Sequence, residues 1–157
     1  MSADRVDDVL DEEVTERMVA HLDAMIGRYR SGEPLQYVLG RWAFRHLDLF
    51  VDERVLIPRL ETEEVAGVAI EFARSVEGAR SVIDLGTGSG AIGLSLAIEL
   101  PIDNTSIWMT DISPDALTVA RANLAGIRRP ARNGTIIESR WFDALPANLQ
   151  ALSLIHI

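Results

Sequence analysis

A short glycine-rich segment holds the residues whose types and spacing could do chemistry. Residues 84–90 read Asp-Leu-Gly-Thr-Gly-Ser-Gly and stand between an expected strand and an expected helix. Glycine has no Cβ, so a ligand can approach such a loop closely. The loop also directs backbone N–H groups and the amino end of the following helix toward that ligand. The segment therefore predicts a small-molecule site at the end of the strand.

A second acidic residue stands in a matching place on the next strand. Asp111 ends the expected strand at residues 106–110, and a carboxylate there can accept hydrogen bonds from two ribose hydroxyls. Together, the loop and Asp111 predict a site for a nucleoside-containing cofactor. The alternative is a tight structural turn followed by an exposed aspartate.

Two cofactors fit this glycine pattern. Residues 86–91 also match the dinucleotide pattern G-x-G-x-x-G/A, so an NAD-dependent oxidoreductase domain is one alternative. Asp84 favours S-adenosylmethionine, because a carboxylate beside the loop would repel a pyrophosphate. S-adenosylmethionine has no phosphate and presents a cationic sulfonium and an amino group. We therefore expect S-adenosylmethionine as the cofactor.

The elements around the loop alternate between strand and helix. Strands are expected at residues 81–85, 106–110 and 135–138, and helices at 91–100 and 113–126. This order predicts an α/β fold, the front half of a doubly wound parallel sheet. Three parallel strands leave an open edge, so a non-catalytic fragment that pairs through this edge is a further alternative. Residues 151–157 are either a fourth strand cut short or foreign residues.

Three elements are expected before the sheet. Apolar residues recur at helical spacing over residues 12–30, and such a stripe must pack against another element. Residues 42–57 alternate as strands do, with a turn expected near residues 52–54. Thr62 is expected to cap the next helix. The stripe of the first helix comprises Val14, Met18, Leu22, Met25, Ile26 and Tyr29.

Composition excludes several classes of protein. The 157 residues are 48% hydrophobic and 25% charged, as in a globular domain. The absence of cysteine excludes disulfide scaffolds and cysteine-ligated zinc, and three distant histidines predict no metal site. A net charge of −9 disfavours nucleic acid as a partner. The acidic start is not a signal peptide and no apolar stretch could span a membrane, so we expect a cytoplasmic protein.

Three blocks of the sequence resemble the HemK-type release factor glutamine methyltransferases. They are residues 32–44, residues 56–63 (Leu-Ile-Pro-Arg-Leu-Glu-Thr-Glu) and residues 82–92 with 111–123. The second block is the most specific, and the resemblance covers about residues 12–150. It implies a Rossmann-like, S-adenosylmethionine-dependent enzyme that methylates the glutamine side-chain amide of the Gly-Gly-Gln motif in peptide chain release factors, which are then its partners.

The resemblance also implies roles for single residues. The methionine part of the cofactor would lie on the loop and the ribose on Asp111. The adenine would lie beside Trp141, whose alternative role is that of a core anchor. The implied cofactor-binding residues are Gly86, Thr87, Gly88, Ser89, Gly90, Asp111 and Trp141. The implied substrate-side wall is Pro58, Arg59, Glu61 and Thr62, although a capped strand-to-helix turn explains the same residues. Family members usually have Pro at the position of Leu60 and Asp at that of Arg140.

One motif of the family is absent. The Asn-Pro-Pro-Tyr segment that orients the substrate amide does not occur in this sequence. We therefore expect a chain truncated at both ends, with no catalytic residue of its own and no activity alone. Residues 1–40 would be a remnant of the N-terminal helical domain, 41–60 a β-hairpin linker and 61–157 the cofactor-binding half. A nucleic-acid N6-adenine methyltransferase shares the motif's chemistry, but the charge of −9 disfavours it.

Overall fold

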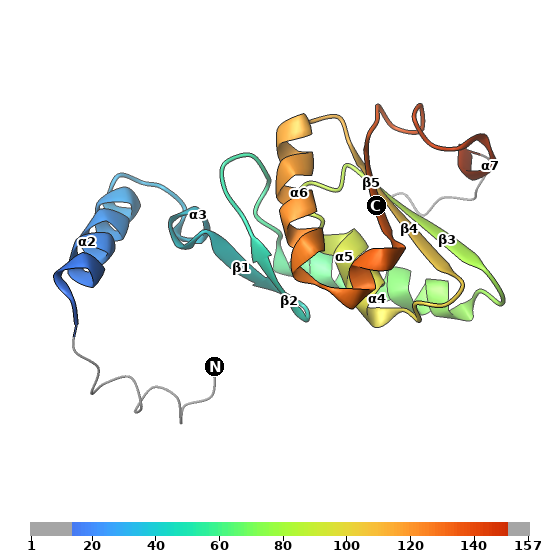
Figure 1. The fold of residues 1–157 in the computed structure, drawn as a ribbon, viewed down its shortest axis with the longest axis horizontal. Helices are drawn as coiled ribbons and strands as arrows, with labels where there is room; N and C mark the ends of the chain where they lie inside the picture. Colours follow the sequence, from blue (N-terminus) through green and yellow to red (C-terminus); the bar gives the residue numbers. More distant parts are fainter. Residues whose placement is uncertain (1–13, 151–157) are drawn as a thin grey trace, which may run out of the picture. The chain divides into compact units, whose positions relative to one another are not determined.

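A computed structural model describes residues 14–150 of the chain (Figure 1). The expectation for residues 151–157 therefore lies outside the described residues. The chain divides into two compact units, one ending at Leu39 and the other beginning at Gly40. Among residues 14–150, no helix combines the length and the apolar character that crossing a lipid bilayer requires.

The first unit contains the helix that the apolar spacing predicts. Helix α2 spans Glu16–Arg30, and the Thr15 side chain accepts a hydrogen bond from Met18 N at its amino end. The short helix α3 spans Leu35–Leu39. No residue of α2 is buried, and its stripe residues Met18 and Leu22 are more than half exposed. The helix is confirmed, while the packing of its stripe stays a prediction.

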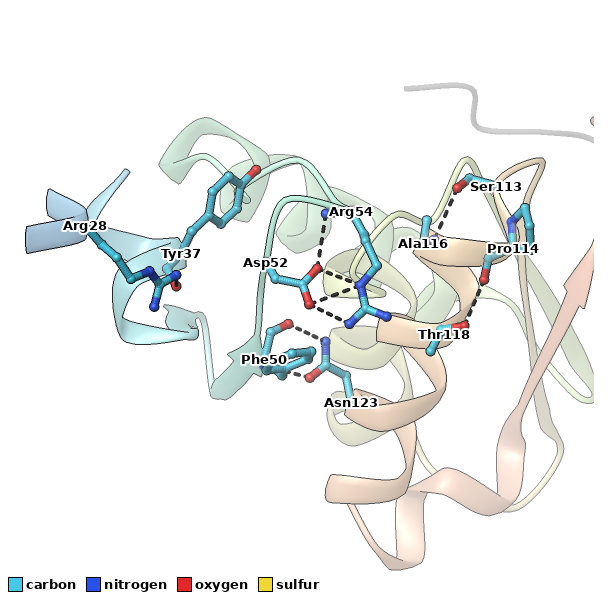
Figure 2. A network of polar contacts seen from close by, with 10 residues as sticks. All are labelled: Arg28, Tyr37, Phe50, Asp52, Arg54, Ser113, Pro114, Ala116, Thr118 and Asn123. Carbon is cyan, nitrogen blue, oxygen red and sulfur yellow. Dashed lines mark hydrogen bonds and ion pairs between the residues drawn. The ribbon is translucent and has the colours of Figure 1, made fainter. Parts of the chain in front are cut away.

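The second unit begins with a β-hairpin that is shorter than expected. Strands β1 (Arg41–Phe44) and β2 (Leu47–Phe50) pair antiparallel, with Phe44 opposite Leu47. The connecting turn is therefore Arg45-His46, where Arg45 has a φ of 48°. The turn expected at residues 52–54 exists but follows the hairpin, because the Asp52 carboxylate accepts bonds from the backbone and side chain of Arg54 (Figure 2). The prediction of a strand continuing to residue 57 is wrong.

Helix α4 (Leu60–Ser75) starts before the cap that the sequence predicts. Arg59 is the N-cap and makes no side-chain hydrogen bond, so Thr62 lies inside the helix and the prediction of a Thr62 cap is wrong. The helix begins early because the backbone of Arg59, directly after Pro58, is extended. The Thr62 N–H already donates to the Arg59 carbonyl at 3.0 Å. Leu60 thus occupies the first helical position, where proline is favoured in general.

The remaining elements form the predicted parallel α/β layer. The strands are β3 (Arg80–Leu85), β4 (Thr105–Asp111) and β5 (Gly134–Glu138), in the order β3-β4-β5. The helices are α5 (Ala91–Glu99), α6 (Pro114–Gly126), the 3₁₀-helix η1 (Arg129–Asn133) and α7 (Ala147–Gln150). Because all three strands are parallel, their carboxyl ends share one edge of the sheet. The fold class is confirmed.

The core lies between the sheet and helices α5 and α6. Met109 of β4 is fully buried between Gly93 of α5 and Gly134 of β5, and Gly134 in turn faces Leu124 of α6. Both helices therefore pack on the face of the sheet that carries Met109. Burying each large apolar side chain contributes roughly 1.5–3 kcal/mol. This packing fixes the loops at the strand ends.

Candidate cofactor-binding site

The glycine loop at residues 86–90 connects β3 to α5 in a conformation that needs glycine. Gly86, Gly88 and Gly90 have φ values of 72°, 55° and 88°, which residues with a Cβ rarely adopt. The Thr87 N–H donates to the Thr110 carbonyl at 2.8 Å, and the Gly90 N–H donates to the Thr87 carbonyl at 2.8 Å. The loop is therefore fixed to the end of β4, and Gly90 caps α5 without covering its first N–H groups with a side chain.

Asp84 reaches from β3 under the loop. Its Oδ2 atom accepts hydrogen bonds from the Thr87 hydroxyl at 2.6 Å and from the Gly93 N–H at 2.9 Å. Its Oδ1 atom accepts none from the described residues and is not among their fully buried unpartnered atoms. Burial raises the pKa of Asp84, and the nearby Asp111 carboxylate raises it further, against the opposing effect of the two hydrogen bonds. A cation next to Oδ1 would relieve this cost.

Gly93 lets helix α5 come close to Asp84. A Cβ on this residue would lie 2.4 Å from Met109 Cγ and 3.0 Å from Asp84 Oδ2. The first distance is far below van der Waals contact, and the second is already tight. Residue 93 therefore has no room for a side chain while Met109 fills the core and the α5 backbone binds the carboxylate.

Asp111 is held by the backbone on both sides. Its Oδ2 atom accepts from the Gly88 N–H at 2.9 Å, and its Oδ1 atom accepts from the Ser113 N–H at 3.0 Å. Each carboxylate oxygen has a second lone pair that these bonds leave available. The arrangement fixes the carboxylate in one orientation, and it suits a ligand that offers two neighbouring hydroxyl groups.

Two exposed apolar side chains follow the ends of β4 and β5. The Ser139 N–H donates to the Asp111 carbonyl at 3.0 Å, so the two strand ends stay side by side. Ile112 comes next on one side and is 67% exposed; Trp141 follows on the other and is 59% exposed. The alternative that Trp141 anchors the core is therefore wrong. Sequence reasoning missed Ile112, although its place directly after the strand-end aspartate was the available signal.

The expected substrate-side wall lies at the start of helix α4. Pro58 is buried, Thr62 is half-buried, and Arg59 and Glu61 are exposed. Within residues 14–150, no hydrogen bond or ion pair joins their side chains to the glycine loop or to Asp111. The contacts of the structure thus bring together the expected loop residues and Asp111, and they do not bring the wall residues to them. No group of three or more metal-ligating side chains occurs in the described part.

Known proteins match this chain over most of its length. The family model described as "Methyltransferase small domain" matches residues 68–151. A protein of Gloeobacter violaceus named release factor glutamine methyltransferase is 44% identical over 121 residues, which are 76% of this chain and 40% of that protein. Proteins of the same name from Vibrio cholerae and Escherichia coli are 38% and 39% identical, over 81% and 85% of this chain. The chain spans 42% and 46% of their lengths.

A solved structure shares the fold at low sequence identity. The human methyltransferase 10 domain containing protein matches with a TM-score of 0.50 and 16% identity, over 69% of this chain and 49% of that one. The α/β fold of this chain is therefore shared with that solved structure.

Proposed function

Because this chain belongs to the methyltransferase small domain family, we propose that it serves S-adenosylmethionine-dependent methylation of a glutamine side-chain amide in peptide chain release factors. The observation that carries the proposal is the pair of strand-end carboxylates around the glycine loop. Asp84 keeps an oxygen available for a cation, and Asp111 is oriented for two hydroxyl groups. The names of the curated relatives support the substrate.

In this proposal, each part of the cofactor is assigned to particular residues of the site. Asp84 Oδ1 would accept hydrogen bonds from the amino group of the methionine part, and Asp111 would accept them from the ribose hydroxyls. The apolar side chains of Ile112 and Trp141 would lie along the adenine, where an aromatic ring can stack. The cofactor supplies a methyl group on a cationic sulfur, and a nearby carboxylate favours that charge.

The same carboxylates argue against NAD. Asp111 is close enough to Asp84 that its charge raises the pKa of Asp84. A pyrophosphate on this loop would add further negative charge to the same place, which Coulomb repulsion disfavours. A nucleic-acid substrate is disfavoured by the net charge of −9 and by the protein substrate in the relatives' names.

The residues proposed to contact the substrate lie outside the glycine loop. An amide nitrogen is a poor nucleophile, so its orientation toward the methyl group must supply much of the rate. We propose that the segment holding Pro58, Arg59, Glu61 and Thr62 forms the substrate-side wall, with its exposed side chains Arg59 and Glu61 toward the release factor. Residues 41–60 would link the sheet to the helical first unit. We propose that the reaction takes place in the cytoplasm, because the proposed substrate acts in translation. Asn-Pro-Pro-Tyr does not occur in the 157 residues, so the role proposed for this chain is to hold the cofactor.

Calorimetric titration tests the cofactor directly. S-adenosylhomocysteine, the product form of the cofactor, should bind one per chain, and NADH should give no heat of binding under the same conditions. Binding of NADH with no response to S-adenosylhomocysteine would reject the proposal in favour of the oxidoreductase alternative. Asp103→Asn is a suitable control for substitutions of Asp84 and Asp111, because Asp103 is an exposed carboxylate away from the loop.

The substrate is tested with tritiated S-adenosylmethionine and a release factor. Any label that is transferred should enter only a factor that retains its Gly-Gly-Gln glutamine, with a Gln→Ala factor as the control. Label in added DNA or RNA would favour the adenine methyltransferase alternative. Because Asn-Pro-Pro-Tyr does not occur in these 157 residues, we expect the chain to bind the cofactor without transferring label.

A further inference from the structure

The side chain of Asn123 joins two segments that are far apart in the sequence. Asn123 lies on α6 and is only 6% exposed. Its Oδ1 atom accepts from the Phe50 N–H at 2.7 Å, and its Nδ2 atom donates to the Phe50 carbonyl at 3.0 Å (Figure 2). The same Nδ2 donates to the Ser89 carbonyl at 2.9 Å. One amide thus binds the last residue of β2 and the middle of the glycine loop.

Only an amide side chain can make this set of bonds. Both Nδ2 hydrogens point to carbonyl oxygens, while Oδ1 faces an N–H, so the site needs two donors and an acceptor on one planar group. A carboxylate of the same shape would face two carbonyl oxygens with no hydrogen to share. A buried amide in a helix is costly unless it is satisfied, and these three bonds satisfy it.

The hairpin has a second attachment at its other end. Arg45, in the turn between β1 and β2, donates to both carboxylate oxygens of Glu99 at 2.7 and 2.8 Å, and to the Glu63 carbonyl at 3.0 Å. Glu99 is the last residue of α5, the helix that follows the glycine loop. The hairpin is therefore connected through Asn123 to the loop before α5, and it is bonded directly to the last residue of α5 through Arg45.

We propose that Asn123 is a positioning residue that makes the hairpin and the glycine loop respond as one unit to the cofactor. Cofactor bound on the loop orders the hairpin end at Phe50, and a correctly placed hairpin strengthens cofactor binding, because coupling between two sites is reciprocal. The inference rests on the proposed function, since it takes the S-adenosyl group as the ligand of the loop. It also gives the cofactor an effect on residues 58–62, which follow the hairpin and form the proposed substrate-side wall.

Hydrogen exchange in the unaltered chain is the first test. Adding saturating S-adenosylhomocysteine should slow exchange of the Phe50 amide by at least about tenfold, because that N–H opens only when the bond to Asn123 breaks. The amides of α2, which belong to the other unit, serve as the internal reference and should not change. An unchanged Phe50 amide in a chain that binds S-adenosylhomocysteine would overturn the coupling and leave the proposed function standing.

An isosteric variant is the second test. Asn123→Asp should weaken S-adenosylhomocysteine binding by at least about tenfold and abolish the response of the Phe50 amide. Asn133→Asp is the matched control, because the Asn133 side chain donates to the Ile102 carbonyl at 2.7 Å and is not hydrogen-bonded to Phe50 or Ser89. The control should bind within twofold of the unaltered chain.

The outcomes separate the two proposals. A folded Asn123→Asp chain with unchanged affinity overturns the coupling alone. Failure of the unaltered chain to bind S-adenosylhomocysteine overturns both the coupling and the proposed function. If Asn123→Asp does not fold, the exchange of the Phe50 amide in the unaltered chain decides.

Discussion

Two aspartates lie at or next to the ends of neighbouring strands of the same sheet, and their carboxylates are hydrogen-bonded differently. Asp84, near the end of β3, receives both of its hydrogen bonds on one oxygen, from Thr87 and Gly93. Asp111, at the end of β4, receives one bond on each oxygen, from Gly88 and Ser113. The first carboxylate keeps an oxygen available at an electrostatic cost, while the second is held rigidly from both sides.

The two aspartates therefore have different proposed roles: Asp84 faces the ligand, while Asp111 also holds the loop. Burial and the neighbouring charge raise the pKa of Asp84, so its ionised form is costly until a cation arrives. Asp111 contributes to the loop itself, because it binds the Gly88 N–H. Changing Asp84 should therefore affect the ligand more than the fold, and changing Asp111 should affect both.

The largest effect is expected for Asp111→Asn. The variant amide must turn its NH₂ group toward either the Gly88 or the Ser113 N–H, so one backbone donor loses its acceptor and the ribose loses charged contacts. With charged hydrogen bonds at about 1.5–3 kcal/mol each, S-adenosylhomocysteine affinity should fall at least about 100-fold by calorimetry. A fall of less than tenfold would show that Asp111 does not hold the ribose.

Asp84→Asn should lower the affinity for the cofactor less than Asp111→Asn does. It should raise the stability of the ligand-free chain instead of lowering it. The amide oxygen can replace Oδ2 toward Thr87 and Gly93, while the NH₂ group replaces the available Oδ1. Affinity for S-adenosylhomocysteine should fall about 10- to 100-fold, as expected for one charged hydrogen bond. The melting temperature of the ligand-free chain should rise at neutral pH, because a costly buried charge is removed. A fall in both quantities would contradict the assignment of Asp84 as the ligand-facing carboxylate.

Trp141→Ala tests the apolar side of the same site. Base–aromatic stacking contributes about 1–3 kcal/mol, so affinity should fall about tenfold. The melting temperature should stay nearly constant, because the side chain is 59% exposed. Trp141→Phe is the control and should retain most of the affinity. A large loss of stability would contradict a role of Trp141 that is limited to the ligand.

The smallest effect is a pH dependence of stability that comes from Asp84. The pKa of Asp84 is raised in the folded chain above its ordinary value of 3.8, so the folded state binds this proton more tightly than the unfolded state. Its contribution to stability is therefore present at low pH and is lost as pH rises through the raised pKa. The stability advantage of Asp84→Asn over the unaltered chain should grow over that window in denaturant titrations. A constant advantage would contradict the raised pKa.

Much of the fold followed from pattern and turn chemistry. Ser113 accepts from the Ala116 N–H and Pro114 begins α6, at the start of the helix expected from residue 113 (Figure 2). The strand–loop–helix order around Gly86 was equally readable, because glycine spacing and strand periodicity agree there. The family also followed from the sequence, chiefly from the block at residues 56–63.

The errors arose where a tertiary contact or one backbone conformation decides. The hairpin turn contains Arg45 with a positive φ, which cannot be predicted from the residue type. The Arg45 side chain is bonded to Glu99, 54 positions later in the sequence. The N-cap of helix α4 is Arg59, whose side chain makes no capping hydrogen bond. The sequence therefore favoured Thr62, a residue type with a stronger capping preference, and this prediction was wrong. The bonds of Asn123 could not be predicted, because Phe50 and Ser89 meet it only in the folded chain.

The close approach at Gly93 has a consequence for how this sequence can change. The space that a Cβ would need there is filled by Met109, so a side chain at position 93 requires a shorter one at position 109. In a library that randomises both positions, we expect survivors to vary them together, with a small residue at one wherever the other is large. The two positions should thus evolve as a compensating pair rather than as independent sites.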